Sequence, residues 1–376
     1  MLLSNRFTKS IGFEPLGQTV SPYSLLNSSN RRNEFLVLAI YLVSVSVILS
    51  ASKIAMGDDP ACQLSNSGAP QQSEIYEIST RHLPDQFRCI NFDQPNVEVN
   101  KWSNNCWTPS NVEQALPSGG TGILTIIYVH GNFMERNNAL ERFLIVDRFL
   151  KEQTVRPYRL LMLSWPSQKE RKPLRDVFSN AESAECQSLY FAWMLQRLRN
   201  EPQLSVLGFS FGARAVTGGL HLDAGGILPG YAQSPLPNTS SVLNIRLGLV
   251  APAIDRNWID RNGRHNLALT HVDSLINLYN SKDPILRRFR FLDRFSRPIA
   301  AGFSGFADFA TLSNPRATQP LTGQTRIHQY DCGSVIGTTH SEKSYYGECP
   351  YFRTLIQHLL WKEPGDSTCN ASIVPQ

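Results

Sequence analysis

The sequence predicts an α/β fold in which helices cover both faces of a mostly parallel central sheet. Short segments rich in Val, Ile and Leu alternate with segments of helical periodicity, which is typical of repeated strand and helix units. Several of the apolar segments are continuous, as expected for strands that are buried on both faces of a parallel sheet. The 376 residues are 41% hydrophobic and 18% charged, so the chain can bury a large core.

The amino-terminal part of the chain predicts a tail followed by a membrane segment. Residues 1–34 are polar and lack apolar periodicity. Residues 35–52, from Phe35 to Ser52, carry no charge and just reach the length that crosses a bilayer. Four Lys or Arg residues precede this segment, so the positive-inside rule places the amino terminus in the cytoplasm. We expect one hydrophobic helix that anchors the domain on the extracytoplasmic side.

A cleaved signal peptide is the alternative for the same segment. Ser50, Ala51 and Ser52 offer the small residues of a cleavage site, and the domain would then be exported. The leader of 34 residues is long for a signal peptide, which favours the anchor.

The remaining elements follow in order along the chain. Residues 53–120 are rich in Pro, Asn, Gln and Ser and predict a linker and edge-strand region, residues 121–365 the main α/β domain, and residues 366–376 a tail. Strands are predicted at 74–78, 96–99, 123–129, 159–167 (ending in a turn), 204–209, 245–250, 274–279 and 326–330. Helices are predicted at 134–153, 180–198, from residue 210 onward, and at 350–361.

The sequence Gly208-Phe209-Ser210-Phe211-Gly212 joins a predicted strand to a predicted helix. A serine on so sharp a turn needs small neighbours two positions before and after it, which the two glycines provide. The amino terminus of the following helix favours an anion at the same place. We therefore predict that Ser210 is a nucleophile.

A serine hydroxyl needs a base to take its proton and a third group to hold that base. Asp283 follows the strand at 274–279, and Asp255, after the strand at 245–250, is the alternative acid. His340 is the histidine in a predicted loop after Asp283, whereas His328 falls inside a predicted strand. These candidates occur in the chain order Ser, Asp, His. We therefore predict His340 as the base.

The oxyanion that forms in such a reaction needs preorganised N–H donors. We expect the backbone N–H of Phe211 to be one donor. The loop after the strand at 123–129 supplies the other, from either Asn132 or Phe133.

Four motifs in this order resemble those of the α/β-hydrolase superfamily, and in particular a group of bacterial α/β hydrolases of unknown function. They are His130-Gly131-Asn132, Ser164-Trp165-Pro166-Ser167, Gly208-Phe209-Ser210-Phe211-Gly212 and Ala251-Pro252-Ala253-Ile254-Asp255. The resemblance covers residues 120–362 and implies a serine hydrolase without naming a substrate. The family commonly has His-Ser-Met-Gly around the nucleophile, whereas this chain has phenylalanine on both sides of Ser210.

Cysteine and charge usage exclude several other classes of protein. The seven cysteines form no C-x-x-C pair, so we expect no metal site. Six of them lie in predicted loops and Cys186 in a predicted helix, which suggests three disulfides and one thiol in an exported domain. A bond between Cys332 and Cys349 would fix the loop of His340.

The net charge of +5 is scattered along the chain, and no phosphate-binding glycine motif follows a strand. We therefore expect neither nucleic acid nor a nucleotide cofactor as a partner.

The sequence thus predicts a serine hydrolase that cleaves a carboxylic ester, thioester or amide without a cofactor. Its partners would be a small-molecule or acyl substrate and, through residues 35–52, a membrane. The alternative is a non-catalytic, membrane-tethered binding or scaffold protein with the same fold. The Gly-, Pro- and Ser-rich stretch at residues 224–241 is a candidate lid.

Overall fold

The computed structural model describes residues 73–83, 95–168, 173–229, 243–292, 296–307 and 325–362. The contacts within the chain divide it into two units, Met1–Ser52 and Lys53–Gln376. Every helix and strand described below belongs to the second unit. The predicted tail and hydrophobic segment lie outside the described residues, as does most of the region at 224–241. Within the described ranges, no helix combines the length and the apolar character that a membrane span requires.

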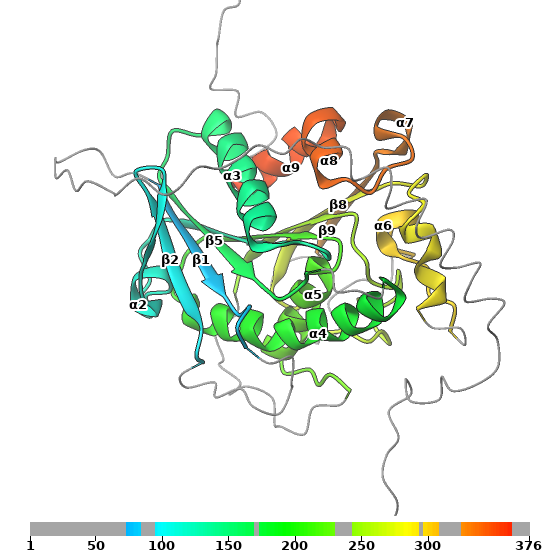
Figure 1. The fold of residues 1–376 in the computed structure, drawn as a ribbon, viewed down its shortest axis with the longest axis horizontal. Coiled ribbons are helices and arrows are strands. Elements are labelled where there is room, and N and C mark those ends of the chain that lie inside the picture. Colours follow the sequence, from blue (N-terminus) through cyan, green and yellow to red (C-terminus); the bar gives the residue numbers. More distant parts are fainter. Residues whose placement is uncertain are drawn as a thin grey trace, which may run out of the picture. The chain divides into compact units, whose positions relative to one another are not determined.

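A nine-stranded sheet forms the centre of this unit, with the strand order β3-β2-β1-β5-β4-β6-β7-β8-β9 (Figure 1). Each strand in the series β1-β5-β4-β6-β7-β8-β9 pairs in parallel with its neighbour. Strand β2 runs antiparallel to both of its neighbours, β1 and β3. The strands are β1 (Glu74–Ser79), β2 (Glu98–Ser103), β3 (Cys106–Pro109), β4 (Leu124–Val129), β5 (Tyr158–Ser164), β6 (Leu204–Phe209), β7 (Ile245–Val250), β8 (Val272–Tyr279) and β9 (Arg326–Asp331). The predicted α/β fold with a mostly parallel sheet is therefore confirmed.

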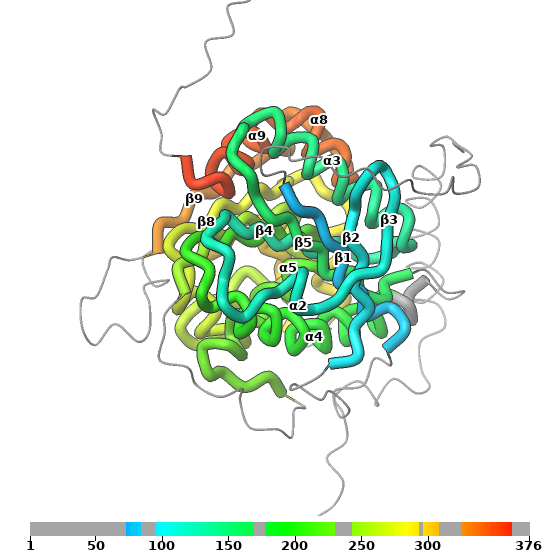
Figure 2. The backbone as a smooth tube through the Cα atoms, turned by 90° about the vertical axis from the view of Figure 1, so that its left-hand side faces the viewer, coloured from blue at the N-terminus to red at the C-terminus, as the bar shows by residue number. Residues whose placement is uncertain are grey.

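Helices cover both faces of this sheet. Figures 1 and 2 show α3, α8 and α9 on one side and α4 and α5 on the other. The longer helices are α3 (Arg136–Gln153), α4 (Pro173–Arg197), α5 (Gly212–Asp223), α8 (Glu342–Glu348) and α9 (Tyr351–Leu359), and the short ones are α2 (Val112–Ala115), η1 (Leu286–Phe291), α6 (Ala301–Ser304) and α7 (Gly333–Ile336). Predicted helices correspond to α3, α4, α5 and α9, whereas α8 is too short and too polar to show helical periodicity.

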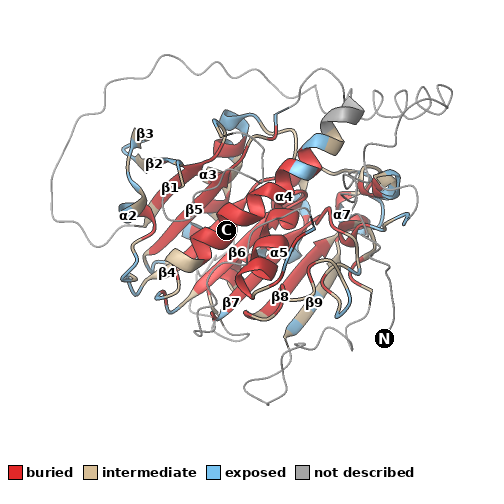
Figure 3. Cartoon of the chain, turned by 90° about the horizontal axis from the view of Figure 1, so that it is seen from below, coloured by how far each residue is buried: buried red, intermediate tan, exposed pale blue. Residues whose placement is uncertain are grey.

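The central strands are buried along their whole length, as the continuous apolar segments predict. Every residue of β5, β6 and β7 is buried, and Figure 3 shows that burial extends over α4 and α5. A strand that has neighbours on both edges and helices on both faces has no solvated side, which explains the absence of an alternating pattern.

The region before β4 contributes three strands to the sheet. β1 lies between β2 and β5 and is an interior strand, while β3 is the edge and begins at Cys106, a residue predicted to lie in a loop. β1 also carries a buried charge: Glu77 is fully buried and binds the Arg136 guanidinium of α3 and the Asn100 amide of β2. These contacts join β1 to a helix and a neighbouring strand of the fold.

The chain order of the strands determines where a site can form. From β4 the chain moves outward to β5, and it then returns to the other side of β4 to form β6. Such a reversal leaves a crevice at the carboxyl ends of the two strands on either side of it. The loops after β4 and β6 both lie at this position, and they contain His130 to Phe133 and Ser210.

We predict that Arg136→Ala lowers the free energy of unfolding by about 2 kcal/mol, because the buried Glu77 carboxylate loses its ion pair and keeps only the Asn100 amide and the charge of Arg81. Chemical denaturation of the purified chain would measure this change. Arg148→Ala, on the exposed face of the same helix, is the matched control and should change stability by less than about 0.5 kcal/mol. Equal effects of the two substitutions would contradict the role given to the Glu77 pair.

Candidate active site

Ser210 lies on a sharp turn between β6 and α5. Its backbone has a φ of 50°, in the left-handed region that non-glycine residues rarely adopt. The turn is held from the neighbouring strand β7, because the Ser210 N–H donates to the Val250 carbonyl at 3.0 Å and the Ala253 N–H donates to the Ser210 carbonyl at 3.0 Å. These contacts stabilise a strained backbone, as is common where a side chain must be presented for chemistry.

Gly212 is required by a close approach of two backbones. A Cβ atom at this position would lie 2.2 Å from the Val129 carbonyl oxygen and 2.6 Å from that of His130, so no side chain fits. Gly131 is limited in the same way, since its Cβ would lie 2.7 Å from the Phe209 ring and 3.1 Å from the Ser210 Cβ. The two glycines therefore allow the loop after β4 to contact the turn that carries Ser210.

The structure brings Ser210, His340 and Asp283 into one chain of hydrogen bonds. Ser210 Oγ lies 2.9 Å from His340 Nε2, and His340 Nδ1 lies 2.5 Å from Asp283 Oδ2. The carboxylate accepts from Nδ1–H, which leaves Nε2 as the acceptor for the serine hydroxyl proton. Asp283 is fully buried, Ser210 is 5% exposed and the His340 side chain is 16% exposed.

Asp283 is oriented by its own turn. Its Oδ1 accepts the backbone N–H groups of Ile285 at 2.8 Å and Leu286 at 3.0 Å, at the start of η1, while Oδ2 faces His340. The Asp-Pro sequence therefore forms a turn, and the same carboxylate holds the imidazole.

The alternative residues do not contact His340. Asp255 accepts the backbone N–H groups of Asn257 and Ile299, each at 2.9 Å, so its carboxylate ties the loop after β7 to the segment before α6. His328 lies within β9, where it pairs with Ile276 of β8.

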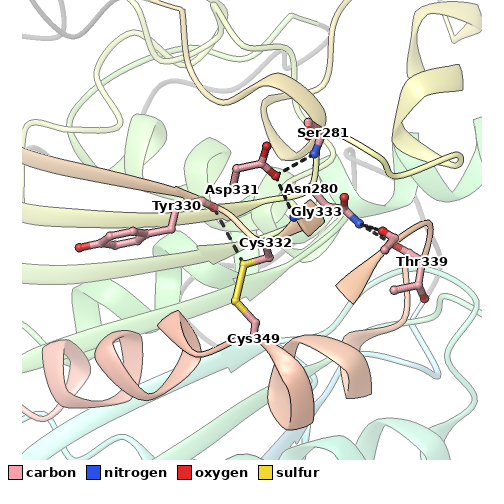
Figure 4. Close-up of a disulfide and its surroundings, with 9 residues drawn as sticks. Asn280, Ser281, Tyr330, Asp331, Cys332, Gly333, Thr339 and Cys349 are labelled. Carbon is pink, nitrogen blue, oxygen red and sulfur yellow. Dashed lines mark hydrogen bonds between the residues drawn. A yellow bond between two sulfur atoms is a disulfide. The ribbon is translucent and has the colours of Figure 1, made fainter. Parts of the chain in front are cut away.

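The loop that carries His340 is fixed by buried contacts (Figure 4). The Asn280 amide, fully buried after β8, donates to the carbonyls of Gly337 and Thr339, each at 2.9 Å. A disulfide joins Cys332 and Cys349 on either side of His340, at a Cα–Cα distance of 5.9 Å. The Asp283 turn and the His340 loop are therefore held together independently of the contact between the two side chains themselves.

The remaining cysteines are only partly described. Cys106 is disulfide-bonded. Cys186 is buried and carries a thiol, as its helical position predicts. Cys62, Cys89 and Cys369 lie outside the described residues.

His130 supports the loop after β4. Its ring stacks on Trp165 at a centroid distance of 5.4 Å, and its Nδ1–H donates to the Gly131 carbonyl at 2.9 Å. Nε2 accepts from the Trp165 backbone N–H and from the Arg81 guanidinium, each at 3.1 Å, so the ring is neutral. Burial and the charge of Arg81 lower the pKa of His130 from 6.5 to about 3. His130 is therefore a structural residue of this loop.

Asn132 and Phe133, the two expected sources of the second oxyanion donor, differ in their contacts. The Phe133 N–H donates to the Asn132 Oδ1 at 2.9 Å, and the Asn180 amide of α4 donates to the same oxygen at 2.7 Å. Phe133 has a φ of 55°. Phe211 lies at the amino end of α5, where backbone N–H groups have no acceptor within the helix.

Arg81, Asn180 and Asn280 support the site without any signal in the sequence. Arg81 donates to the Ser164 hydroxyl at 2.8 Å and to the Met134 carbonyl at 3.0 Å, in addition to His130. Each of these residues acts on a segment at least 48 positions away, and no local motif marks such a contact. Among the residues that the structure describes, no cluster of three or more His, Cys, Asp or Glu side chains could hold a metal ion.

Comparisons with known proteins give distant similarities. No protein-family model and no curated protein matches the chain. The chain is similar to MGS-M1, an α/β hydrolase from a Medee basin deep-sea metagenome library, with 13% identity over 64% of this chain and 79% of that one, at a TM-score of 0.27. It is also similar to the apo form of esterase 2 of Thermogutta terrifontis, with 11% identity over 68% and 88% of the two chains, at a TM-score of 0.31.

We predict that His130 makes the fold sensitive to acid. An imidazole that is neutral when folded and titrates at 6.5 when unfolded contributes stability above pH 6.5, and this contribution is lost as the pH falls toward 3. The difference in unfolding free energy between the wild type and His130→Gln should therefore shrink by about 2 kcal/mol between pH 7 and pH 5. Denaturant titrations at both pH values would measure it, and a constant difference would contradict the neutral state.

Proposed function

We propose that the protein is a serine hydrolase that cleaves a carboxylic ester, thioester or amide through an acyl-enzyme. The observation that carries this proposal is the unbroken chain of hydrogen bonds from Ser210 Oγ through His340 to the buried Asp283. A nucleophile, a base and a group that orients the base are the parts that such a reaction needs. The strained backbone of Ser210 supports the same assignment.

The geometry supports a two-step mechanism. Ser210 Oγ attacks the carbonyl carbon while His340 Nε2 takes its proton, and the Asp283 carboxylate stabilises the imidazolium that forms. The imidazolium then donates this proton to the leaving alcohol, thiol or amine, which leaves an acyl group on Ser210. Water, deprotonated by the same Nε2, releases the acid and restores the serine.

We propose the backbone N–H groups of Phe211 and Asn132 as the oxyanion donors. The Asn132 N–H is favoured over that of Phe133, because the Phe133 N–H already donates to the Asn132 side chain. Donors fixed before the reaction stabilise the oxyanion most, and Asn180 and Gly131 hold this loop close to Ser210.

A fluorophosphonate probe tests the proposal directly, since it reacts only with an activated serine. We expect labelling of the wild type at Ser210, located by peptide mass spectrometry, and none of Ser210→Ala. Asp283→Asn should slow labelling by a factor of about 10³–10⁴, because the imidazole loses its orientation and its counter-charge. Asp255→Asn is the matched control and should react at close to the wild-type rate.

Absence of labelling in the wild type would favour the alternative function, a non-catalytic binding or scaffold protein on the same fold. Where labelling occurs, hydrolysis of p-nitrophenyl esters of increasing acyl length would then define the preferred acyl group.

We also propose that residues 35–52 anchor the domain in a membrane, with residues 53–376 on the extracytoplasmic side. The support is the uncharged stretch and the basic residues before it. The chain should stay in the membrane pellet after carbonate extraction, and protease added outside intact cells should digest the domain. Release of a chain shortened at its amino terminus would instead identify a cleaved signal peptide.

A further inference from the structure

A buried acid follows the proposed base at a distance of two residues. Glu342 begins α8, directly after the loop that carries His340, and it is only 4% exposed. Glutamate is rarely buried unless it is paired, because removing a carboxylate from water is costly. The mechanism described above does not use this group.

Glu342 connects the His340 turn to the central sheet. Its Oε1 accepts the hydroxyl of Tyr128 at 2.8 Å and that of Tyr346, whereas its Oε2 has no hydrogen-bond partner among the described residues. Tyr128 belongs to β4 and precedes His130 by two positions. The carboxylate therefore joins β4, which leads to the proposed oxyanion loop, with the loop that carries His340.

The groups around Glu342 are Tyr128 from β4, Tyr346 from its own helix, Arg142 from α3, and His340. Burial raises its pKa to about 7, and the two tyrosine hydroxyls and the charges of Arg142 and His340 act in the opposite direction. The nearby Lys343 pairs with Glu141 at the surface. Glu342 thus changes its charge close to neutral pH, in electrostatic contact with the imidazole.

We propose that Glu342 is a positioning residue for His340, and this rests on the proposed serine hydrolase function. Its carboxylate anchors the turn to β4, and its negative charge favours the imidazolium that forms when Ser210 loses its proton. A negative charge in a buried site stabilises a positive charge that forms beside it, because little water is present to screen the two. Protonation of Glu342 removes this charge, and the unpartnered Oε2 gains no hydrogen bond in return.

The central test is the pH profile of fluorophosphonate labelling in Glu342→Gln, which preserves the volume and the accepting oxygen but removes the charge. We expect the acidic limb of the profile to move to lower pH by about 0.5–1 unit, because the variant no longer carries the buried carboxyl that gains a proton near neutral pH. The plateau rate should fall by a factor of about 10, because the imidazolium that forms in the reaction loses a stabilising negative charge.

A matched control and a second variant make the result specific. Asp147 of α3 is also a buried carboxylate that accepts a tyrosine hydroxyl, from Tyr158 at 2.7 Å, and Asp147→Asn should leave the acidic limb in place. Tyr128→Phe removes one donor from Glu342, which raises the pKa of that carboxyl. It should lower the labelling rate several-fold at pH 7, with recovery at pH 8.5. This variant also decides the matter if Glu342→Gln does not fold, as judged by circular dichroism.

The outcomes separate the two proposals. In one outcome the wild type is labelled, and folded Glu342→Gln shows the same acidic limb and the same plateau rate of labelling. That result would overturn the positioning role and leave the hydrolase proposal intact. A loss in Tyr128→Phe that is the same at every pH would also overturn it, since a merely structural contact gives that result. Wild type that is not labelled at all would overturn both proposals.

Discussion

The close contact between Gly212 and the backbone at the end of β4 is the constraint on which the site depends. Because the Val129 and His130 carbonyls occupy the space where a side chain would begin, α5 can start only at a glycine. That contact fixes the first turn of α5 against the loop after β4. It therefore sets the distance between Ser210 and the backbone proposed to bind the oxyanion. The positive φ of Ser210 is tolerated because β7 holds the same turn from its other side.

Most residues of the four sequence motifs support the site and do not enter the proposed reaction. Trp165 stacks on His130 and donates its indole N–H to the His130 carbonyl at 2.9 Å. Ala253 holds the serine turn, and Asp255 holds the segment before α6. These contacts are made between loops at the carboxyl ends of different strands. The side chains proposed to react are therefore supported by hydrogen-bonded loops at the carboxyl end of the sheet.

Local sequence was sufficient for the parts of the fold that depend on local chemistry. Continuous apolar segments located β4 to β8, whereas β9 is polar and half-exposed, and the paired glycines located the serine turn. The chain order and the strand ends then selected Asp283 and His340, which the structure places within hydrogen-bond distance of each other. Arg81, Asn180, Asn280 and Glu342 could not be found in this way, because each is identified by a hydrogen bond to a distant segment. β1 was visible as a strand, but its interior position follows from its pairing with β5, 80 or more residues later.

The disulfide between Cys332 and Cys349 makes the competence of the site depend on where the chain matures. It closes a segment of 17 residues around the proposed base, and a loop of this size loses about 3 kcal/mol of conformational freedom in the unfolded chain when it is closed. In an oxidising compartment the disulfide forms, and this constraint is present before any substrate arrives. In a reducing cytosol the same polypeptide would keep its serine, histidine and aspartate, but the His340 loop would depend on the Asn280 hydrogen bonds without the covalent link.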